Sequence, residues 1–217
     1  MNDIEFASLL CSRLCHDLVS PAGALANGIE IMSTERDPEI RNQCMQLLTD
    51  SAEQTINRLK FFRIAFGAGS GFASQIDRAD IEEAIKGLFN PAKVKIEWLP
   101  SMQFIPKVAA KVALNLALIA GDALLWGGTV KIGIETMGKN LDLAIRAEGS
   151  RLSLNDEVHK ALTGDIAIED LSPRSAPAYL VQSLVHSQAS KLNLSIVEDQ
   201  TLTIGISLPM TSKTTEK

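Results

Sequence analysis

The sequence of 217 residues contains no apolar run long enough to cross a bilayer, and its first residues, with Asp3 and Glu5, lack the basic region of a signal peptide. Basic residues are also in the minority, because 21 Lys and Arg stand against 26 Asp and Glu, for a formal net charge of −5. Binding to nucleic-acid phosphates requires a basic face. These absences predict a cytoplasmic protein that has neither a membrane nor a nucleic acid as its partner.

Cysteine is scarce as well, and three cysteines do not make a disulfide framework. Cys11, Cys15 and His16 are close enough in sequence to raise the question of a metal site. On a helical wheel, however, His16 lies about 100° from Cys15 and about 140° from Cys11, too far round to complete a set of ligands. We therefore interpret the thiols as buried structural groups and keep a metal site as the less favoured alternative.

The most informative stretch is His16-Asp17-Leu18-Val19-Ser20-Pro21, inside a long segment of helical periodicity. On the wheel, the apolar side chains of Leu14, Leu18 and Leu25 lie opposite the histidine. The side of His16 carries mostly small or polar residues, namely Leu9, Ser12, Arg13, Val19, Ser20 and Gly23. This pattern predicts an open, accessible imidazole.

Pro21 is expected to bend the helix one turn after His16. It has no N–H to donate to the carbonyl of Asp17, and its ring presses on that carbonyl. The alternative is a break at Ser20, with Pro21 as the first residue of a second helix, because a serine cap followed by proline is a common helix start.

The first third of the chain predicts a helical hairpin. Helical periodicity runs from Ile4 to about Met32, and Asp37 with Pro38 forms a cap and first-turn pair that opens a second helix ending near Phe66. A short turn between two such helices makes them antiparallel. Because a lone hairpin buries only part of its apolar stripes, we expect a homodimer that forms a four-helix bundle.

The segment Gly67-Ala68-Gly69-Ser70-Gly71 predicts a linker, which divides the chain into a hairpin domain at 1–69 and a second domain at 70–217. In the second domain, helices are expected at 80–89, 107–125, after Asn155 and at 178–190, and strands at 94–98, 129–134, 141–146, 194–197 and 202–208. The pattern indicates an α+β fold with helices on one face of a mixed, largely antiparallel sheet.

The sequence from His16 to Pro21 resembles the phosphoacceptor box of sensor histidine kinases, which consists of histidine, acid, aliphatic, any residue, small polar residue and proline. The helical hairpin resembles their dimerisation and phosphotransfer domain. The second domain resembles their ATP-binding domain, an α/β sandwich, along its whole length. The resemblance therefore covers nearly the whole chain and implies that His16 carries a phosphoryl group.

Three ATP-binding elements of the kinases are missing. Ile119 stands where the kinases have a magnesium-binding asparagine, in the segment 115–120, and Ala147 replaces the aspartate of the Asp-x-Gly motif that reads adenine. The glycine-rich phosphate lid is replaced by the segment Ser172–Pro177. This degenerate form is similar to the histidine phosphotransferases of bacterial cell-cycle phosphorelays. That similarity implies no cofactor or metal of the chain's own, with magnesium supplied by the partner receiver domains.

If His16 carries a phosphoryl group, the residues beside it have expected roles. Asp17 accepts a hydrogen bond that fixes the tautomer of the ring, unless it is an ordinary solvated carboxylate. Arg13, Val19, Ser20 and Gly23 would meet the receiver domains of a hybrid histidine kinase and of response regulators. Arg13 has an alternative as an arginine that pairs within its own helix.

Two other functions stay open at this point. One is an ATP-dependent histidine kinase with an unusual site, and the other is a dimeric scaffold that binds receiver domains without carrying phosphate. The remaining histidines, His159 and His186, have no acid and proline in the same arrangement, so we interpret them as surface or structural residues.

Overall fold

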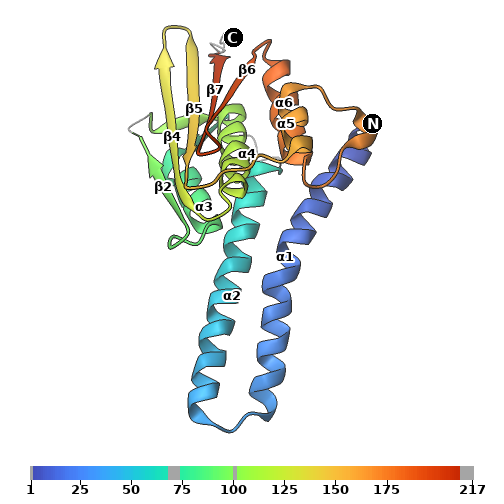
Figure 1. Cartoon of the computed structure of the whole chain (residues 1–217), viewed down its shortest axis with the longest axis vertical. Coiled ribbons are helices and arrows are strands. Elements are labelled where there is room, and N and C mark those ends of the chain that lie inside the picture. The colour runs from blue at the N-terminus through green and yellow to red at the C-terminus, as the bar shows by residue number, and fades with distance from the viewer. Residues whose placement is uncertain (1, 68–73, 100–101, 211–217) are drawn as a thin grey trace, which may run out of the picture.

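The computed structural model describes residues 2–67, 74–99 and 102–210. It consists of a long helical hairpin and an α+β layer packed at the open end of that hairpin (Figure 1). The chain therefore has the α+β fold that the sequence predicts.

The hairpin is made of α1 (Asp3–Thr34) and α2 (Pro38–Ala65). Asn2 caps α1 in a reciprocal arrangement with Glu5, and Asp37 caps α2 with Pro38 in its first turn, as expected. The helix α1 is continuous through the buried Pro21, so the alternative break at Ser20 is wrong. Between the helices, the Leu48 side chain of α2 packs against the backbone of α1 at Gly28, where an added Cβ would lie 2.8 Å from Leu48 Cδ2.

The main sheet has the strand order β2-β4-β5-β7-β6. Its strands are β2 (Val94–Trp98), β4 (Gly128–Met137), β5 (Asn140–Glu148), β6 (Leu192–Val197) and β7 (Thr201–Pro209). Only β2 and β4 are parallel, and the remaining pairs are antiparallel. Alternate residues of the three central strands are buried, which gives the sheet one apolar face and one polar face.

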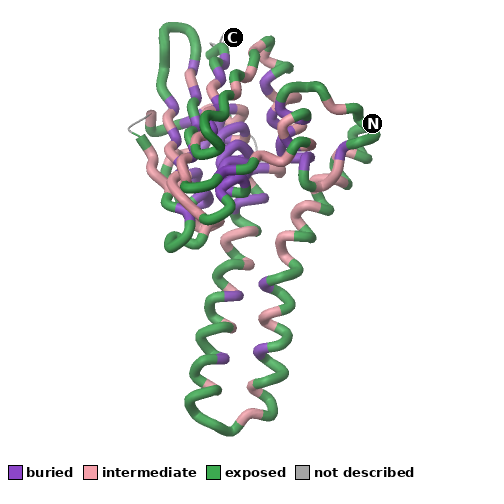
Figure 2. The backbone as a smooth tube through the Cα atoms, in the orientation of Figure 1, coloured by how far each residue is buried: buried purple, intermediate pink, exposed green. Residues whose placement is uncertain are grey.

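Helices cover the apolar face. They are α3 (Arg78–Leu88), α4 (Lys107–Ala123), α5 (Asp156–Thr163) and α6 (Ala176–Ser187), with a short 3-10 helix, η1 (Ile168–Asp170). The helix α4 lies at the centre of the α+β layer, so it is buried on all sides. Its run of alanine, valine and leucine suits this position. Figure 2 shows the corresponding concentration of buried residues around α4.

The structure corrects two local predictions and adds one small sheet. The helix α3 covers Arg78–Leu88 instead of 80–89, and its cap is Asp77, whose Oδ1 accepts from the backbone N–H of Ala79 at 2.8 Å. The helix α6 includes Pro177 in its first turn and ends at Ser187. A small antiparallel sheet of β1 (Gln75–Asp77) and β3 (Phe104–Pro106) was not predicted at all.

The hairpin and the layer share one core. Phe61, Phe62 and Ala65, in the last turns of α2, are fully or almost fully buried in the cluster that includes α4 and the sheet. The expected domain boundary at 69/70 and most of the expected linker fall at 68–73, outside the described residues. Within the described ranges, no helix is long and apolar enough to cross a membrane.

Candidate functional site

His16 lies near the middle of α1, on the side that faces away from α2. Its side chain is 84% exposed, while Pro21 and Gly28, further along the same helix, are buried in the hairpin. The buried face of α1 is therefore turned well away from the imidazole, as the helical wheel predicts. A large partner can reach the ring without any movement of the chain.

Asp17 lies beneath this exposed ring. Its Oδ1 is 3.1 Å from His16 Nδ1, and its side chain is only 10% exposed. The alternative of a solvated surface carboxylate is therefore wrong. Because an ionised carboxylate only accepts hydrogen bonds, the contact requires Nδ1 to carry the proton. In the neutral ring, Nε2 is then the nitrogen with a free lone pair.

The second oxygen of Asp17 is bound by Arg13. Arg13 Nε donates to Asp17 Oδ2 at 2.9 Å, and Arg13 Nη2 donates to Asp122 Oδ2 at 2.8 Å. Burial lowers the pKa of the Arg13 guanidinium, but Asp122 and Asp17 outweigh this effect and raise the pKa above its usual range. The site therefore contains a protonated guanidinium held between two carboxylates from α1 and α4.

The four residues predicted to dock receiver domains differ in their surroundings. Val19 is 69% exposed, Ser20 is exposed, and a Cβ added at Gly23 would meet nothing within 4 Å. These three residues lie on an open surface beside His16. Arg13 does not, because its side chain is only 12% exposed and both ends of its guanidinium are engaged. Arg13 instead pairs with Asp17 of its own helix, which was the alternative in the sequence analysis.

The interpretation of the thiols needs correction. Cys44 is buried in the hairpin, but Cys11 and Cys15 are exposed on α1. In the part of the chain that the structure describes, no group of three or more His, Cys, Asp or Glu residues is arranged to hold a metal ion. His159 is half-buried in α5 and His186 is exposed at the end of α6, so both are placed as expected.

Ile119 and Ala147 are the positions that the resemblance aligns with ATP-binding residues of kinases. Ile119 and Ala147 are both buried, and the neighbouring cavity has a volume of about 30 Å³. It is lined by Arg13 of α1, Asp122 of α4 and Arg174, among others. A cavity of this size has room for a water molecule or two but not for a nucleotide.

Asn115, at the start of the degenerate magnesium motif, has a structural role. Its amide nitrogen donates to the carbonyl of Lys111 at 2.8 Å and to the carbonyl of Ala65, at the end of α2, at 3.3 Å. It thereby ties the hairpin to α4. Glu148, next to Ala147, points to the other face of the sheet, where it forms ion pairs with Lys131 at 2.8 Å and Arg146 at 2.7 Å.

The segment that replaces the phosphate lid is held by α5. Glu157 accepts hydrogen bonds from the backbone N–H of Ser172 and from the hydroxyl of the buried Ser175. Burial raises the pKa of Glu157, but these hydrogen bonds and the charge of Arg174 outweigh it, and the net effect is a lowered pKa. The backbone of the segment is therefore fixed by protein groups.

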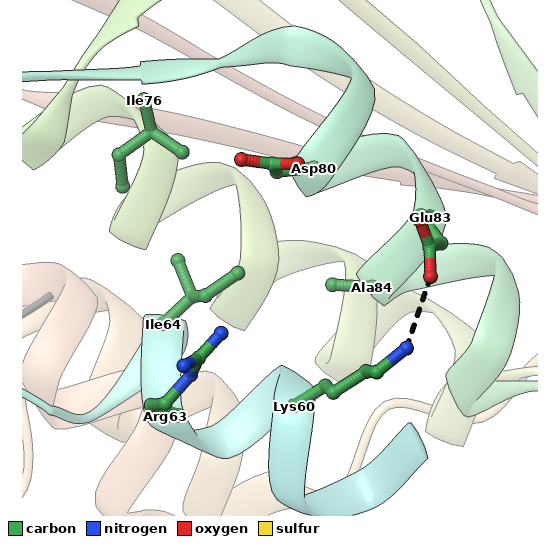
Figure 3. Close-up of a pocket in the computed structure, with 7 residues that line it drawn as sticks. All are labelled: Lys60, Arg63, Ile64, Ile76, Asp80, Glu83 and Ala84. Atoms are coloured by element: carbon green, nitrogen blue, oxygen red, sulfur yellow. Dashed lines mark hydrogen bonds and ion pairs between the residues drawn. The ribbon is translucent and has the colours of Figure 1, made fainter. Parts of the chain in front are cut away.

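A larger cavity of about 330 Å³ lies at the junction of α2, β1 and α3 (Figure 3). Its lining contains charges of both signs, because Lys60 and Arg63 of α2 face Asp80 and Glu83 of α3. Lys60 Nζ forms an ion pair with Glu83 at 3.1 Å. The cavity contains no residue of α1, so it is separate from the surface around His16.

Sequence reasoning did not identify Asp122 as part of the site. It lies 109 residues from Arg13, and no local pattern connects the two positions. Asp122 and Glu148 are the two carboxylates close in sequence to Ile119 and Ala147. The structure engages both in ion pairs with basic side chains.

Comparisons with known proteins agree with this architecture. Residues 78–200, more than half of the chain, match the model of the histidine phosphotransferase C-terminal domain. Protein phosphotransferase ChpT of Brucella abortus (strain 2308) is 29% identical over 194 residues, which cover 89% of this chain and 91% of that protein. A solved structure of a bacterial phosphotransferase has a TM-score of 0.83 and 27% identity, and the match covers 95% of this chain and 97% of the other.

Proposed function

The chain belongs to the histidine phosphotransferase family, and from this premise we propose that His16 is the residue that carries the phosphoryl group between the aspartates of receiver domains. The observation that carries the proposal is the pairing of an 84% exposed imidazole with a nearly buried carboxylate at its Nδ1. This geometry leaves Nε2 accessible for reaction.

The chemistry follows from that orientation. The lone pair of His16 Nε2 attacks the phosphorus of a receiver's aspartyl phosphate, and the bond from phosphorus to the aspartate oxygen breaks, which returns a carboxylate to the receiver. The ring becomes an N-phosphorylated imidazolium that keeps its proton on Nδ1, where Asp17 Oδ1 stabilises the charge. Attack by the aspartate of a second receiver reverses these steps and restores the neutral ring.

The surface around His16 fits a receiver domain. Val19, Ser20 and Gly23 are exposed and small enough to let a second protein come close to the ring. We propose that these three residues contact the receivers, and that the receivers belong to a hybrid histidine kinase and to response regulators. The role of Arg13 lies inside the protein, because its guanidinium is already bound by two carboxylates.

Transfer in this proposal needs no ATP and no metal or cofactor held by this chain. The buried Ile119 and Ala147 cannot contribute the oxygen ligand and the carboxylate that a kinase-type nucleotide site requires. The magnesium ion for each step would belong to the receiver domain. We also propose that the chain works as a cytoplasmic homodimer whose hairpins form a four-helix bundle.

The test is transfer from a purified receiver domain that carries labelled aspartyl phosphate. The wild-type chain should gain an acid-labile, base-stable phosphate, and His16→Gln should gain none. The variant should melt at the wild-type temperature, since the side chain is exposed. His186→Gln, a change at another exposed histidine, is the matched control and should behave as wild type.

Two outcomes would contradict the proposal. Phosphate acceptance by His16→Gln would place the acceptor elsewhere. Saturable receiver binding by the wild-type chain with no phosphate acceptance would favour the scaffold function instead.

A further inference from the structure

Four side chains form a continuous path from the exposed imidazole to the second domain. His16 Nδ1 is 3.1 Å from Asp17 Oδ1, Asp17 Oδ2 is 2.9 Å from Arg13 Nε, and Arg13 Nη2 is 2.8 Å from Asp122 Oδ2. Each contact uses a different atom, so the three contacts form together without competing. The path joins α1, which carries the histidine, to the last turn of α4.

We propose that Asp122 is a positioning residue for phosphotransfer, acting on His16 through Arg13 and Asp17. The inference rests on the proposed role of His16 as the acceptor. It gives the degenerate second domain a task at the reaction centre: α4 holds the guanidinium that in turn holds the carboxylate beneath the ring.

Arg13 and Asp17, in the middle of the path, are nearly buried, and their burial explains why Asp122 at the end of the path matters. The side chains of Arg13 and Asp17 are 12% and 10% exposed, so their charges are largely removed from water and interact strongly. With Asp122 in place, the guanidinium is fixed at two points and presents Nε to Asp17. Without that carboxylate, Asp17 is the one remaining anchor of the guanidinium, so the guanidinium can rotate about that contact and no longer holds the second oxygen of Asp17 in a fixed position.

The ion pair is not needed to attach α1 to the second domain. Other contacts do this, including the packing of Phe6 on Tyr179 and of Leu9 and Leu14 on the common core. The side chain of Asp122 is itself 48% exposed, and a pair with such a partner adds little to the free energy of unfolding. Loss of the ion pair between Arg13 and Asp122 is therefore expected to change the orientation of the side chains at His16 more than the free energy of unfolding.

The experiment compares Asp122→Asn with the matched control Glu83→Gln. Glu83 also joins two helices through an exposed ion pair, to Lys60, but lies in α3 away from the path. Asp122→Asn should lower the single-turnover rate from saturating phosphorylated receiver about 2- to 30-fold, with the half-saturating receiver concentration unchanged. Glu83→Gln should leave both quantities unchanged, and Asp122→Glu should recover part of the rate.

The state of the ring gives a readout that does not depend on transfer. Nitrogen-15 NMR of neutral His16 should show the proton mainly on Nδ1 in the wild type and a smaller Nδ1–H fraction in Asp122→Asn. In an Asp17→Asn background, Asp122→Asn should add no further loss of rate, because its action passes through Asp17.

An unchanged rate and an unchanged tautomer in Asp122→Asn would overturn the inference, as would additive losses in the double variant. These results are distinct from failure of the proposed function. If the wild-type chain accepts no phosphate, the tautomer measurement still decides whether Asp122 orients the ring.

Discussion

The rings of Phe6 and Tyr179 meet edge to face, with their centroids 5.1 Å apart and their planes at 71°. This contact joins the first turns of the hairpin to α6, and Arg13 makes a second junction, to α4, about two turns further along. The N-terminal half of α1 is thus attached to the α+β layer at two points, Phe6 and Arg13. His16 lies one turn after the second of these points. The helix α1, which carries His16, and the α+β layer therefore behave as one structural unit.

The aromatic junction predicts a measurable loss of stability. Phe6→Ala removes the edge-to-face contact together with a half-buried ring, and it should lower the free energy of unfolding by about 1–3 kcal/mol. In a chain of this size, each kcal/mol corresponds to about 2–4 °C in a thermal melt. Ile4→Ala, on the same helix but 78% exposed, is the control and should shift the melt by less than about 1 °C. Equal shifts in melting temperature for the two variants would show that the contact between Phe6 and Tyr179 does not stabilise the packing of α1 on α6.

Much of this architecture was predictable because it depends on local chemistry. The cap and first-turn pair Asp37 and Pro38 determines where α2 begins, and alternation of apolar residues identified the strands from Val94 onward. Sheet partners follow from short hairpins such as the one at Gly138, whose positive φ of 62° suits glycine. The strands β1 and β3 were missed because three residues are too few to show an alternating pattern.

The site was only partly predictable. Periodicity placed His16 on an open face and Asp17 beside it, which the structure bears out. The wheel did not predict which part of α1 packs on a second domain, and that packing buries Arg13 and brings Asp122 to it. For the same reason, the exposure of Cys11 and Cys15 was not foreseen, since the wheel of one helix does not reveal which of its faces are covered.

The lowered pKa of Glu157 predicts a pH-dependent contribution to stability. A carboxyl group whose pKa is depressed by folding stabilises the native state above its unfolded pKa of about 4.3, and the contribution is lost as the pH falls through the folded pKa. Glu157→Gln should therefore melt below the wild type at pH 7, and the difference should narrow below about pH 4. Melting curves across this range provide the test. A difference that stays constant with pH would mean that the ionised carboxylate is not what holds Ser172 and Ser175.

The exposed apolar stripes of the hairpin predict a homodimer. On α2, Met45, Ile56 and Leu59 are each about half exposed and lie within about 60° on a helical wheel. On α1, the exposed Cys11 and Cys15 lie on the same side as Ile29, which is 62% exposed. Such exposed apolar stripes are typical of an interface, and a second hairpin would cover them.

Ile56→Glu should weaken that dimer, because a carboxylate would be buried between apolar side chains. Light scattering at micromolar concentration should give a dimer mass for the wild type and a lower mass for the variant. The control is Gln54→Glu, an exposed change about 200° round the helix from Ile56. Cys11 and Cys15 should also react with a thiol reagent faster in Ile56→Glu than in the wild type. A monomeric wild-type chain, or thiols that react equally fast in both proteins, would contradict the four-helix bundle.

The burial of Ile119 and Ala147, which the resemblance aligns with ATP-binding residues, predicts that the chain does not bind ATP. A kinase-type site needs an oxygen ligand for magnesium, a carboxylate for the adenine amino group and backbone N–H groups near the phosphates. Here Ile119 and Ala147 are buried, and the segment Ser172–Pro177 is bound to Glu157. Each missing polar partner costs about 1–3 kcal/mol, so the three together weaken binding by about two to six powers of ten.

Calorimetric titration with magnesium and ATP tests this expectation directly. We expect no saturable heat up to about 1 mM nucleotide, a concentration that corresponds to about 4 kcal/mol of binding free energy. Ile119→Arg provides the internal check, because a long cation in the cavity of about 30 Å³ would exclude any nucleotide that entered there. Saturable binding below that concentration by the wild type, abolished in Ile119→Arg, would locate ATP at the α4 cavity. The phosphoryl group on His16 would then have a second possible source, and the ATP-dependent kinase would replace the phosphotransferase that draws only on receiver domains.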